Sequence, residues 1–269
     1  MNTNQKKKKE LEKREKNSEQ RKQYFFVTRE LTDREIRRKY ARSYLGILWS
    51  VLAPLLNMVV MSLIFSRMFQ RSIENFPIYY LTGNIIWGLF TSSTNSAMTS
   101  LVDNKALLIK VKLPMRVLTL SRVYTAFVNF LYSFATYILF LFIFKITPSI
   151  SMISIIPIVF LLLLFSIGIS MFLSTLYVFF GDIKHLYGIL LNLLMYLSAI
   201  FYPVTALPET MKHIVSENPM YCYIAAAREC MMYGNFPSAA LWIRMILWAI
   251  VMFGYGQLFF EKMKIKRGE

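Results

Sequence analysis

A stripe of aromatic and polar side chains runs along the second of six long apolar stretches in the sequence. Its members recur at the spacing of one helix face: Tyr80, Asn84, Trp87, Thr91, Thr94 and Asn95. In hydrocarbon, such a stripe must face other protein segments or a water-filled cavity. Aromatic faces beside hydroxyl and amide groups suit sugars, which present apolar C–H faces and polar rims. The alternative is that these groups only join helices to one another by hydrogen bonds.

Motifs for catalysis or for nucleotide binding are missing from the sequence. It contains no metal-ligand spacing, no HExxH, no GxSxG and no phosphate-binding GxxxxGK[ST], and Asp103 and Asp182 are isolated. We therefore expect no catalytic residue, no metal and no cofactor on this chain. No Asp or Glu lies at mid-depth of an apolar stretch, which argues against a proton- or sodium-driven carrier. A passive conduit driven by another subunit remains possible on these grounds.

Six apolar stretches predict an all-α integral membrane protein. A helix needs about 20 apolar residues to cross a bilayer core. All of the stretches meet that length comfortably except the fifth in order, which is short. The stretches are Leu45–Ser66, Ile78–Leu101, Thr119–Phe144, Ile153–Phe180, Tyr187–Tyr202 and Ala239–Phe260. We expect residues 45–260 to form one six-span domain.

The basic residues lie mostly on one side of these stretches. Residues 1–44 hold 15 Lys and Arg, and the loop after the second stretch and the tail 261–269 are also basic, whereas the alternate loops are poor in Lys and Arg. The positive-inside rule therefore places both termini in the cytoplasm. The net charge of +16 then reflects topology and contact with anionic lipid, so we expect no nucleic-acid partner.

The N-terminal region divides into two parts. Residues 1–23 are a Lys/Glu/Gln-rich run that predicts a flexible tail. Residues 24–44 predict an amphipathic helix along the cytoplasmic interface, started by a capping box at Thr32-x-x-Glu35. Its arginines are candidates to bind the phosphates of a lipid-linked substrate, because planar guanidinium groups suit such contacts: Arg34, Arg37, Arg38 and Arg42. A generic anchor beside the first span is the alternative.

Two loops are unusually apolar. The basic loop 102–118 carries several aliphatic residues and Pro114, which predicts a short element that docks into a partner, or else a helix resting on lipid. Residues 203–238 contain two short apolar segments separated by Asn218-Pro219. These predict two re-entrant or interfacial helices, with an ordinary outward loop as the alternative. Cys222 and Cys230 in this segment are predicted to be packed thiols, too far apart on a helix for a disulfide.

Three motifs, in order along the chain, resemble the membrane subunit of polysaccharide, O-antigen and teichoic-acid ABC exporters. The first is Arg38-Lys39-Tyr40-x-x-Ser43-x-Leu45-Gly46-x-x-Trp49-Ser50-x-x-x-Pro54-Leu55. The second is similar to the segment that couples this family to its ATPase: Asn104-x-x-Leu107-x-x-Lys110-x-x-Leu113-Pro114-x-Arg116. The third resembles the two re-entrant helices before the last span: Tyr202-Pro203, Leu207-Pro208 and Asn218-Pro219.

The resemblance implies a permease in a bacterial cytoplasmic membrane that exports a polymer on an undecaprenyl-pyrophosphate carrier. A homodimer would pair with two copies of a separate subunit that binds ATP and Mg. The implied ATPase contact comprises Asn104, Leu107, Lys110, Leu113, Pro114 and Arg116, and Pro208, Asn218 and Pro219 would break the re-entrant helices. The expected channel surface comprises Trp49, Tyr80, Asn84, Trp87, Thr91, Asn95, Tyr196 and Tyr202. A permease for a drug or small lipid, and a membrane-embedded lipid-linked glycosyltransferase, are the alternatives.

Overall fold

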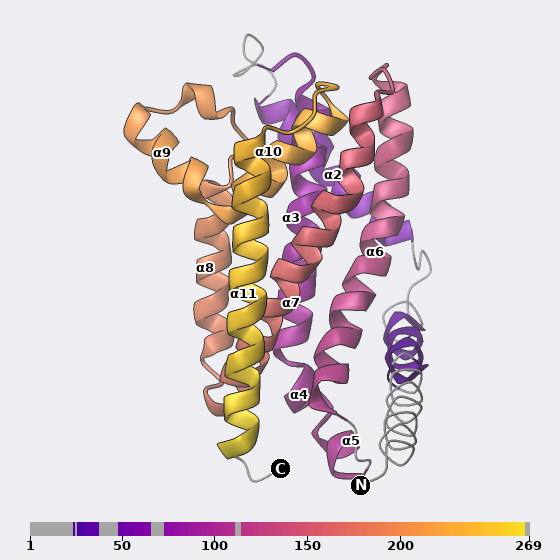
Figure 1. The fold of residues 1–269 in the computed structure, drawn as a ribbon. Coiled ribbons are helices and arrows are strands. Elements are labelled where there is room, and N and C mark those ends of the chain that lie inside the picture. Colours follow the sequence, from indigo (N-terminus) through magenta and orange to yellow (C-terminus); the bar gives the residue numbers. More distant parts are fainter. Residues whose placement is uncertain (1–23, 25, 38–47, 66–72, 111–113, 267–269) are drawn as a thin grey trace, which may run out of the picture.

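The computed structural model describes residues 24, 26–37, 48–65, 73–110 and 114–266. All regular structure in these ranges is helical. Figure 1 shows a bundle of long helices with short helices at both of its ends. The predicted all-α class is therefore confirmed.

Within the described residues, six helices of 15 to 29 residues overlap the six apolar stretches. They are α2 (Leu48–Phe65), α3 (Phe76–Met98), α6 (Met115–Ile143), α7 (Ile155–Phe179), α8 (Ile183–Leu197) and α11 (Ala239–Lys266). Three apolar segments in the described ranges are long enough to cross a membrane: Met115–Ile143, Ile150–Phe179 and Ala239–Met263. The apolar helical segments Leu52–Phe65 and Ile183–Leu197 are shorter, and α3 is long but carries the polar stripe. A multi-pass membrane protein follows from these lengths.

Helix α8 begins four residues before the predicted fifth stretch and ends at Leu197. Its early start places Lys184 and His185 on the helix. The predicted continuation to Tyr202 is wrong, because Ala199 has a positive φ of 50° and the carbonyl groups of Ala199 and Ile200 accept hydrogen bonds from Arg228. A long-range partner thus ends this helix.

Helix α3 lies at the centre of the bundle and packs against α2, α6, α7 and α10. Helices α7 and α11 form the most extensive pair, and their backbones meet at two glycines. A Cβ atom on Gly168 would lie 2.2 Å from the Met252 carbonyl oxygen, and one on Gly256 would lie 2.1 Å from the Gly168 carbonyl oxygen. Small residues permit such close helix crossings in membranes.

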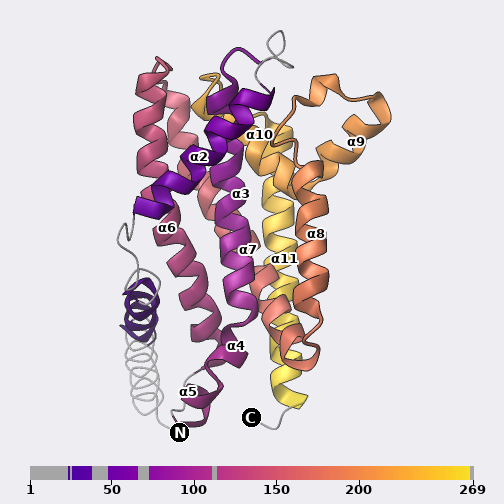
Figure 2. The same cartoon turned by 180° about the vertical axis from the view of Figure 1, so that it is seen from behind.

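Short helices occupy the two ends of the bundle. The helix of residues 26–37, α4 (Ser100–Asp103), α5 (Lys105–Lys110) and the C-terminal part of α11 share one end, which we call the basic end (Figure 1). The opposite end carries the 3₁₀ helices η1 (Ile150–Ser154) and η2 (Val204–Ala206), with α9 (Glu209–Glu217) and α10 (Pro219–Met231). Figure 2 shows α2 running obliquely over α3 and α6.

The Asn218-Pro219 pair separates α9 from α10. The Asn218 side-chain oxygen accepts a hydrogen bond from the Met220 amide, which caps α10, while its amide group donates to the Leu197 carbonyl at the end of α8. One side chain therefore fixes both the start of α10 and its position against α8. Cys222 and Cys230 of α10 are buried free thiols.

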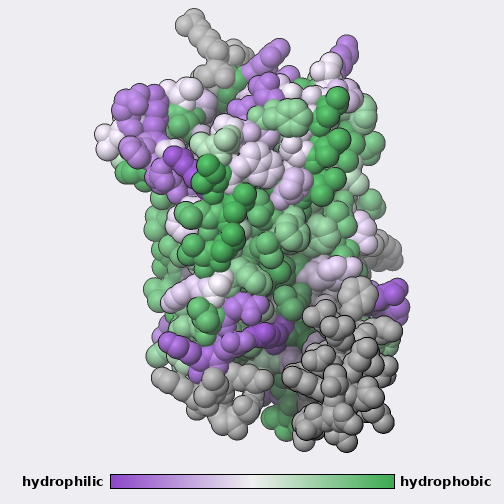
Figure 3. Space-filling view, viewed as in Figure 1, coloured by the Kyte–Doolittle hydropathy of each residue, from purple (hydrophilic) through white to green (hydrophobic). Residues whose placement is uncertain are grey.

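Large aliphatic side chains cover the outside of the bundle. Ile243, Ile250 and Leu258 along α11 are about two-thirds exposed. Figure 3 shows hydrophobic residues across the middle of this face and hydrophilic residues towards both ends. An apolar surface of this kind in the middle of the face fits a lipid environment.

Candidate functional site

The segment α4–α5 has one face that packs against the rest of the protein and one face that is exposed. Leu107 and Leu108 pack on an apolar cluster at the basic end, formed by Leu31, Leu101, Val117, Leu118, Met171 and Phe260. Asn104, at the joint between the two helices, is almost buried and donates a hydrogen bond to the Ser100 carbonyl. Lys105, Ile109 and Lys110 are exposed, Ile109 by 76%. This outer face of α5 is apolar and basic together.

The other residues of the predicted ATPase contact have different surroundings. Pro114 directly precedes α6 in an extended conformation. Arg116 forms an ion pair with Glu261 of α11, so its guanidinium is engaged within the chain. Leu113 lies outside the described residues.

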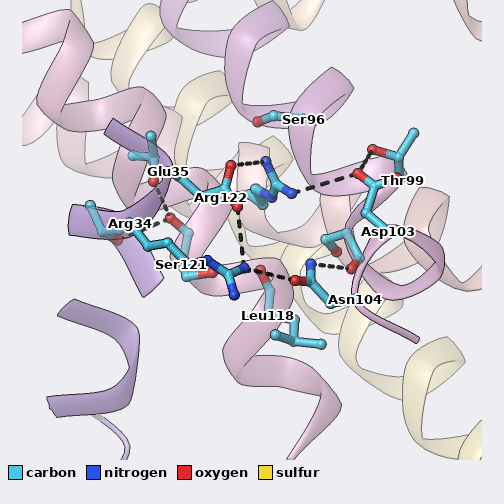
Figure 4. Close-up of polar contacts among 12 residues, drawn as sticks. Arg34, Glu35, Ser96, Thr99, Asp103, Asn104, Leu118, Ser121 and Arg122 are labelled. Atoms are coloured by element: carbon cyan, nitrogen blue, oxygen red, sulfur yellow. Dashed lines mark hydrogen bonds and ion pairs between the residues drawn. The ribbon is translucent and has the colours of Figure 1, made fainter. Parts of the chain in front are cut away.

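A network of charged groups joins three segments at the basic end (Figure 4). Arg122 of α6 donates to Glu35 at 2.8 Å and lies 3.6 Å from the Asp103 carboxylate. Arg34 contacts Glu35 at 3.3 Å and donates to the Asn104 side-chain oxygen at 2.9 Å. The side chains of Arg122 and Glu35 are only 16% and 11% exposed. The network therefore connects residues 26–37 with α4 and α6.

The predicted capping box at Thr32 and Glu35 is wrong. Both residues lie within a helix that is already formed at residue 26. The buried Thr32 hydroxyl donates to the Ser121 carbonyl, and Glu35 pairs with Arg122. The hydroxyl and carboxylate groups that would form a local cap are instead bonded to residues of α6. Of the other predicted interface arginines, Arg37 is exposed, and Arg38 and Arg42 lie outside the described residues.

Two connected cavities lie between α3 and α6. One, of about 280 Å³, is lined by Asn84, Trp87 and Thr91 of α3, by residues of α6 and by Pro54 of α2. The other, of about 450 Å³, is lined by Glu35, Ser92, Ser96, Arg122, Thr125, Ala126 and Asn129. Ser92, Ala126 and Asn129 line both. Together they form a groove, here called the polar groove, that reaches the charged network.

A third cavity, of about 560 Å³, lies between α3 and α8. Its lining includes Trp87, Thr91 and Asn95 of α3 with Lys184 and His185 of α8. Trp87 and Thr91 thus line cavities on both sides of α3, whereas Asn84 faces the polar groove and Asn95 faces α8. The structure brings these four predicted channel residues to two cavities.

The remaining predicted channel residues lie elsewhere. Tyr80 is 3% exposed and stacks on Phe201 at 5.9 Å between ring centroids. Trp49 on α2 is exposed. Tyr196 near the end of α8 is also exposed, and its carbonyl accepts a hydrogen bond from the Tyr202 hydroxyl. Their contribution to a channel remains a prediction.

Arg228 of α10 is a buried charge that was not among the predicted site residues. Its guanidinium donates to the carbonyl groups of Ala199 at 2.9 Å, Ile200 at 3.1 Å and Tyr79 at 3.3 Å, and it lies 3.4 Å from the centre of the Tyr79 ring. Hydrogen bonds to backbone carbonyls and a cation–π contact therefore stabilise the buried guanidinium. The run of small and apolar residues Ile224–Ala227, which precedes Arg228, is the sequence feature that could have indicated its burial.

Metal chemistry finds no support in the described ranges, where no three His, Cys, Asp or Glu side chains gather as a site. The fold and its cavities define a multi-pass helical membrane protein whose cavities are lined in part by polar side chains. The chain matches the ABC-2 type transporter family over residues 27–232 and belongs to that family. This confirms the family indicated by the sequence motifs.

Three relatives illustrate the similarity. An O-antigen export system permease protein RfbA of Klebsiella pneumoniae is 29% identical over 240 residues, which cover 89% of this chain and 92% of that protein. A second RfbA of the same organism is 31% identical over 205 residues, covering 76% and 79%. The polysialic acid transport protein KpsM of Escherichia coli is 26% identical over 210 residues, covering 75% and 79%.

Proposed function

We propose that this chain is the permease subunit of an ABC exporter that moves a lipid-linked polysaccharide, of the O-antigen or teichoic-acid type, outward across the cytoplasmic membrane. The observation that carries the proposal is the central helix α3, whose aromatic, hydroxyl and amide side chains line cavities on both of its sides. Cavities with polar and aromatic lining residues inside an apolar exterior suit the passage of hydroxyl-rich polymers. The relatives named for O-antigen export and polysialic acid transport support a glycan as the cargo.

The energy source in this proposal is a separate ATPase subunit that contacts the outer face of α5. This face offers an exposed aliphatic side chain, Ile109, between Lys105 and Lys110. Exposed apolar groups on a short rigid helix favour a protein partner with a complementary groove. ATP and Mg would bind to that partner. Two permease copies and two ATPase copies would form the complete exporter.

The proposed topology has six spans with both termini in the cytoplasm. The basic end would be cytoplasmic, by the positive-inside rule. Helices α9 and α10 would then form two re-entrant helices at the outer surface, delimited by Pro208 and by the Asn218-Pro219 pair. The buried hydrogen bonds of Asn218 and Arg228 support this, because irregular backbone at membrane depth must be covered by protein.

Co-purification tests the proposal most directly. The chain is expressed with candidate ATPase subunits, and ATP hydrolysis by the isolated complex is measured with and without an undecaprenyl-pyrophosphate-linked glycan. We expect a stable complex whose hydrolysis rate rises with the glycan. Failure to bind any candidate ATPase would contradict the proposal, and equal stimulation by small hydrophobic drugs would favour a different cargo.

A further inference from the structure

The Glu35 carboxylate lies between two guanidinium groups where the polar groove meets the basic end of the bundle (Figure 4). Its Oε2 accepts a hydrogen bond from Arg122 at 2.8 Å, and its Oε1 lies 3.3 Å from Arg34. Carboxylates and phosphates are bound by arginine in the same forked geometry. Glu35 therefore occupies a position in which two arginines would also hold a phosphate.

The cavity beside this carboxylate is lined by groups that suit hydroxyls. The Ser96 hydroxyl donates to the Ser92 carbonyl at 2.6 Å, and the Thr125 hydroxyl donates to the Ser121 carbonyl at 2.8 Å. Each of these side chains uses its only proton within its own helix. Their oxygen lone pairs remain as acceptors for a ligand that donates hydrogen bonds, as sugar and glycerol hydroxyls do.

We propose that the 450 Å³ cavity binds a phosphate ester that carries hydroxyl groups, with the phosphate held in place of Glu35 by Arg122, which lines the cavity, and by Arg34, which contacts Glu35 beside it. This inference rests on the proposed function, because a lipid-linked glycan offers this chemistry at the cytoplasmic surface. A phospholipid with a hydroxylated headgroup offers it as well. Asp103, itself bonded to Thr99, also lies 3.6 Å from the Arg122 guanidinium and would keep this group in place when Glu35 leaves.

Exchange of Glu35 for the ligand changes contacts at the ATPase-facing end. Glu35 connects residues 26–37 to α6, and Arg34 is bonded to Asn104 at the joint of α4 and α5. A ligand that displaces Glu35 breaks the contact between Glu35 and Arg122. The same ligand binds Arg34, which is hydrogen-bonded to Asn104. Occupancy of the cavity is thereby communicated to α5 through one shared arginine.

Three substitutions in the full-length chain, purified in detergent, test the proposal. Binding of undecaprenyl-diphospho-N-acetylglucosamine, phosphatidylglycerol and free N-acetylglucosamine 1-phosphate is measured by ligand-dependent thermal shift. Glu35→Gln removes the internal competitor, so we expect the Kd to fall by about tenfold. Arg122→Gln should raise the Kd by at least about tenfold. Lys262→Gln removes the same charge from an exposed position on α11, outside the three cavities, and is the matched control, with an unchanged Kd.

The pattern across probes identifies the source of the phosphate. Binding of the diphospho-linked sugar alone assigns the cavity to substrate, binding of phosphatidylglycerol assigns it to membrane lipid, and binding of the free sugar phosphate assigns it to the headgroup without a lipid chain. An unchanged or higher Kd in Glu35→Gln overturns the proposal, and this result does not depend on whether Arg122→Gln folds. Loss of binding in Lys262→Gln in place of Arg122→Gln also overturns it. No ATPase is present, so failure of the proposed exporter complex is a separate result.

Discussion

Trp87, like Thr91, lines cavities on both sides of α3. It is 8% exposed and packs against Phe90 with ring centroids 5.8 Å apart. Its indole thus belongs partly to the core and partly to the surface that a ligand would meet. The two roles are separable, because packing affects every activity of the protein and ligand contact affects only those that involve the ligand.

Trp87→Ala should weaken the response to glycan more than the basal activity. Stacking of nucleobases on aromatic side chains contributes about 1–3 kcal/mol per ring, and we take this as the upper guide for a sugar. The concentration of lipid-linked glycan that half-stimulates ATP hydrolysis by the complex should rise by about tenfold. Trp248→Ala, a truncation of the same size in a partly buried ring of α11, is the control. If both variants lose basal and stimulated hydrolysis equally, Trp87 is a packing residue.

Single residues also mark where sequence reasoning stops. The helical spacing of Asn84, Trp87, Thr91 and Asn95 follows from the order of the residues alone, so their common stripe was predictable. The division of that stripe between two cavities was not, because it depends on where α6 and α8 lie. Glu35 and Arg122, which pair with each other, are 87 residues apart in the sequence, and no local pattern predicts their contact.

At the scale of helices, the α7–α11 crossing depends on the absence of side chains at Gly168 and Gly256. A methyl group on Gly256 would meet the backbone of α7, which cannot rotate away. Gly256→Ala should therefore force the helices apart and lower the free energy of unfolding by about 1–3 kcal/mol. Unfolding in detergent micelles, followed by tryptophan fluorescence, measures this change.

Gly254→Ala provides the control for this crossing. No atom lies within 4 Å of a Cβ placed at Gly254, on the same helix and two residues away. The substitution also carries the same gain in helix propensity as Gly256→Ala. We expect Gly254→Ala to be neutral or slightly stabilising, and equal destabilisation by both variants would show that the backbone contact is unimportant.

The outer face of α5 predicts a second helix-scale outcome. Ile109→Gln should fold normally, because the side chain is 76% exposed, yet weaken co-purification of the ATPase by at least about tenfold if Ile109 fills a partner groove. Ile150→Gln is the control, since Ile150 is 77% exposed at the opposite end of the molecule. Wild-type ATPase retention by Ile109→Gln would remove α5 from the proposed interface.

The order of the helices was largely predictable from the sequence, and their exact ends were less so. Length and hydropathy located the long helices, and Asn218-Pro219 located the break between α9 and α10. The end of α8 was missed because Arg228, 31 residues beyond Leu197, takes the carbonyl groups that would continue the helix. Such ends are set by tertiary contacts rather than by local propensity.

At the scale of the whole molecule, the charged network and the polar groove meet at one end of the bundle. The charged network, the basic side chains of α5 and the pair Arg116–Glu261 all lie at the basic end, while the buried Arg228 belongs to α10 at the other end. The polar groove begins at the basic end and continues along α3. An exporter that takes up substrate and energy on the same side of a membrane requires this arrangement.

The orientation of the bundle can be tested by labelling in intact cells. Single cysteines replace Glu74 or Glu209, which are exposed in regions poor in Lys and Arg, and Lys105 or Lys262, which are exposed in basic regions. Cys222 and Cys230 are both 0% exposed, so the parent chain should remain unlabelled and serves as the control. The positive-inside rule predicts that an impermeant thiol reagent labels the first pair in intact cells and the second pair only after the membrane is opened. Labelling of Lys105→Cys from outside would invert the topology and would separate α5 from any cytoplasmic ATPase.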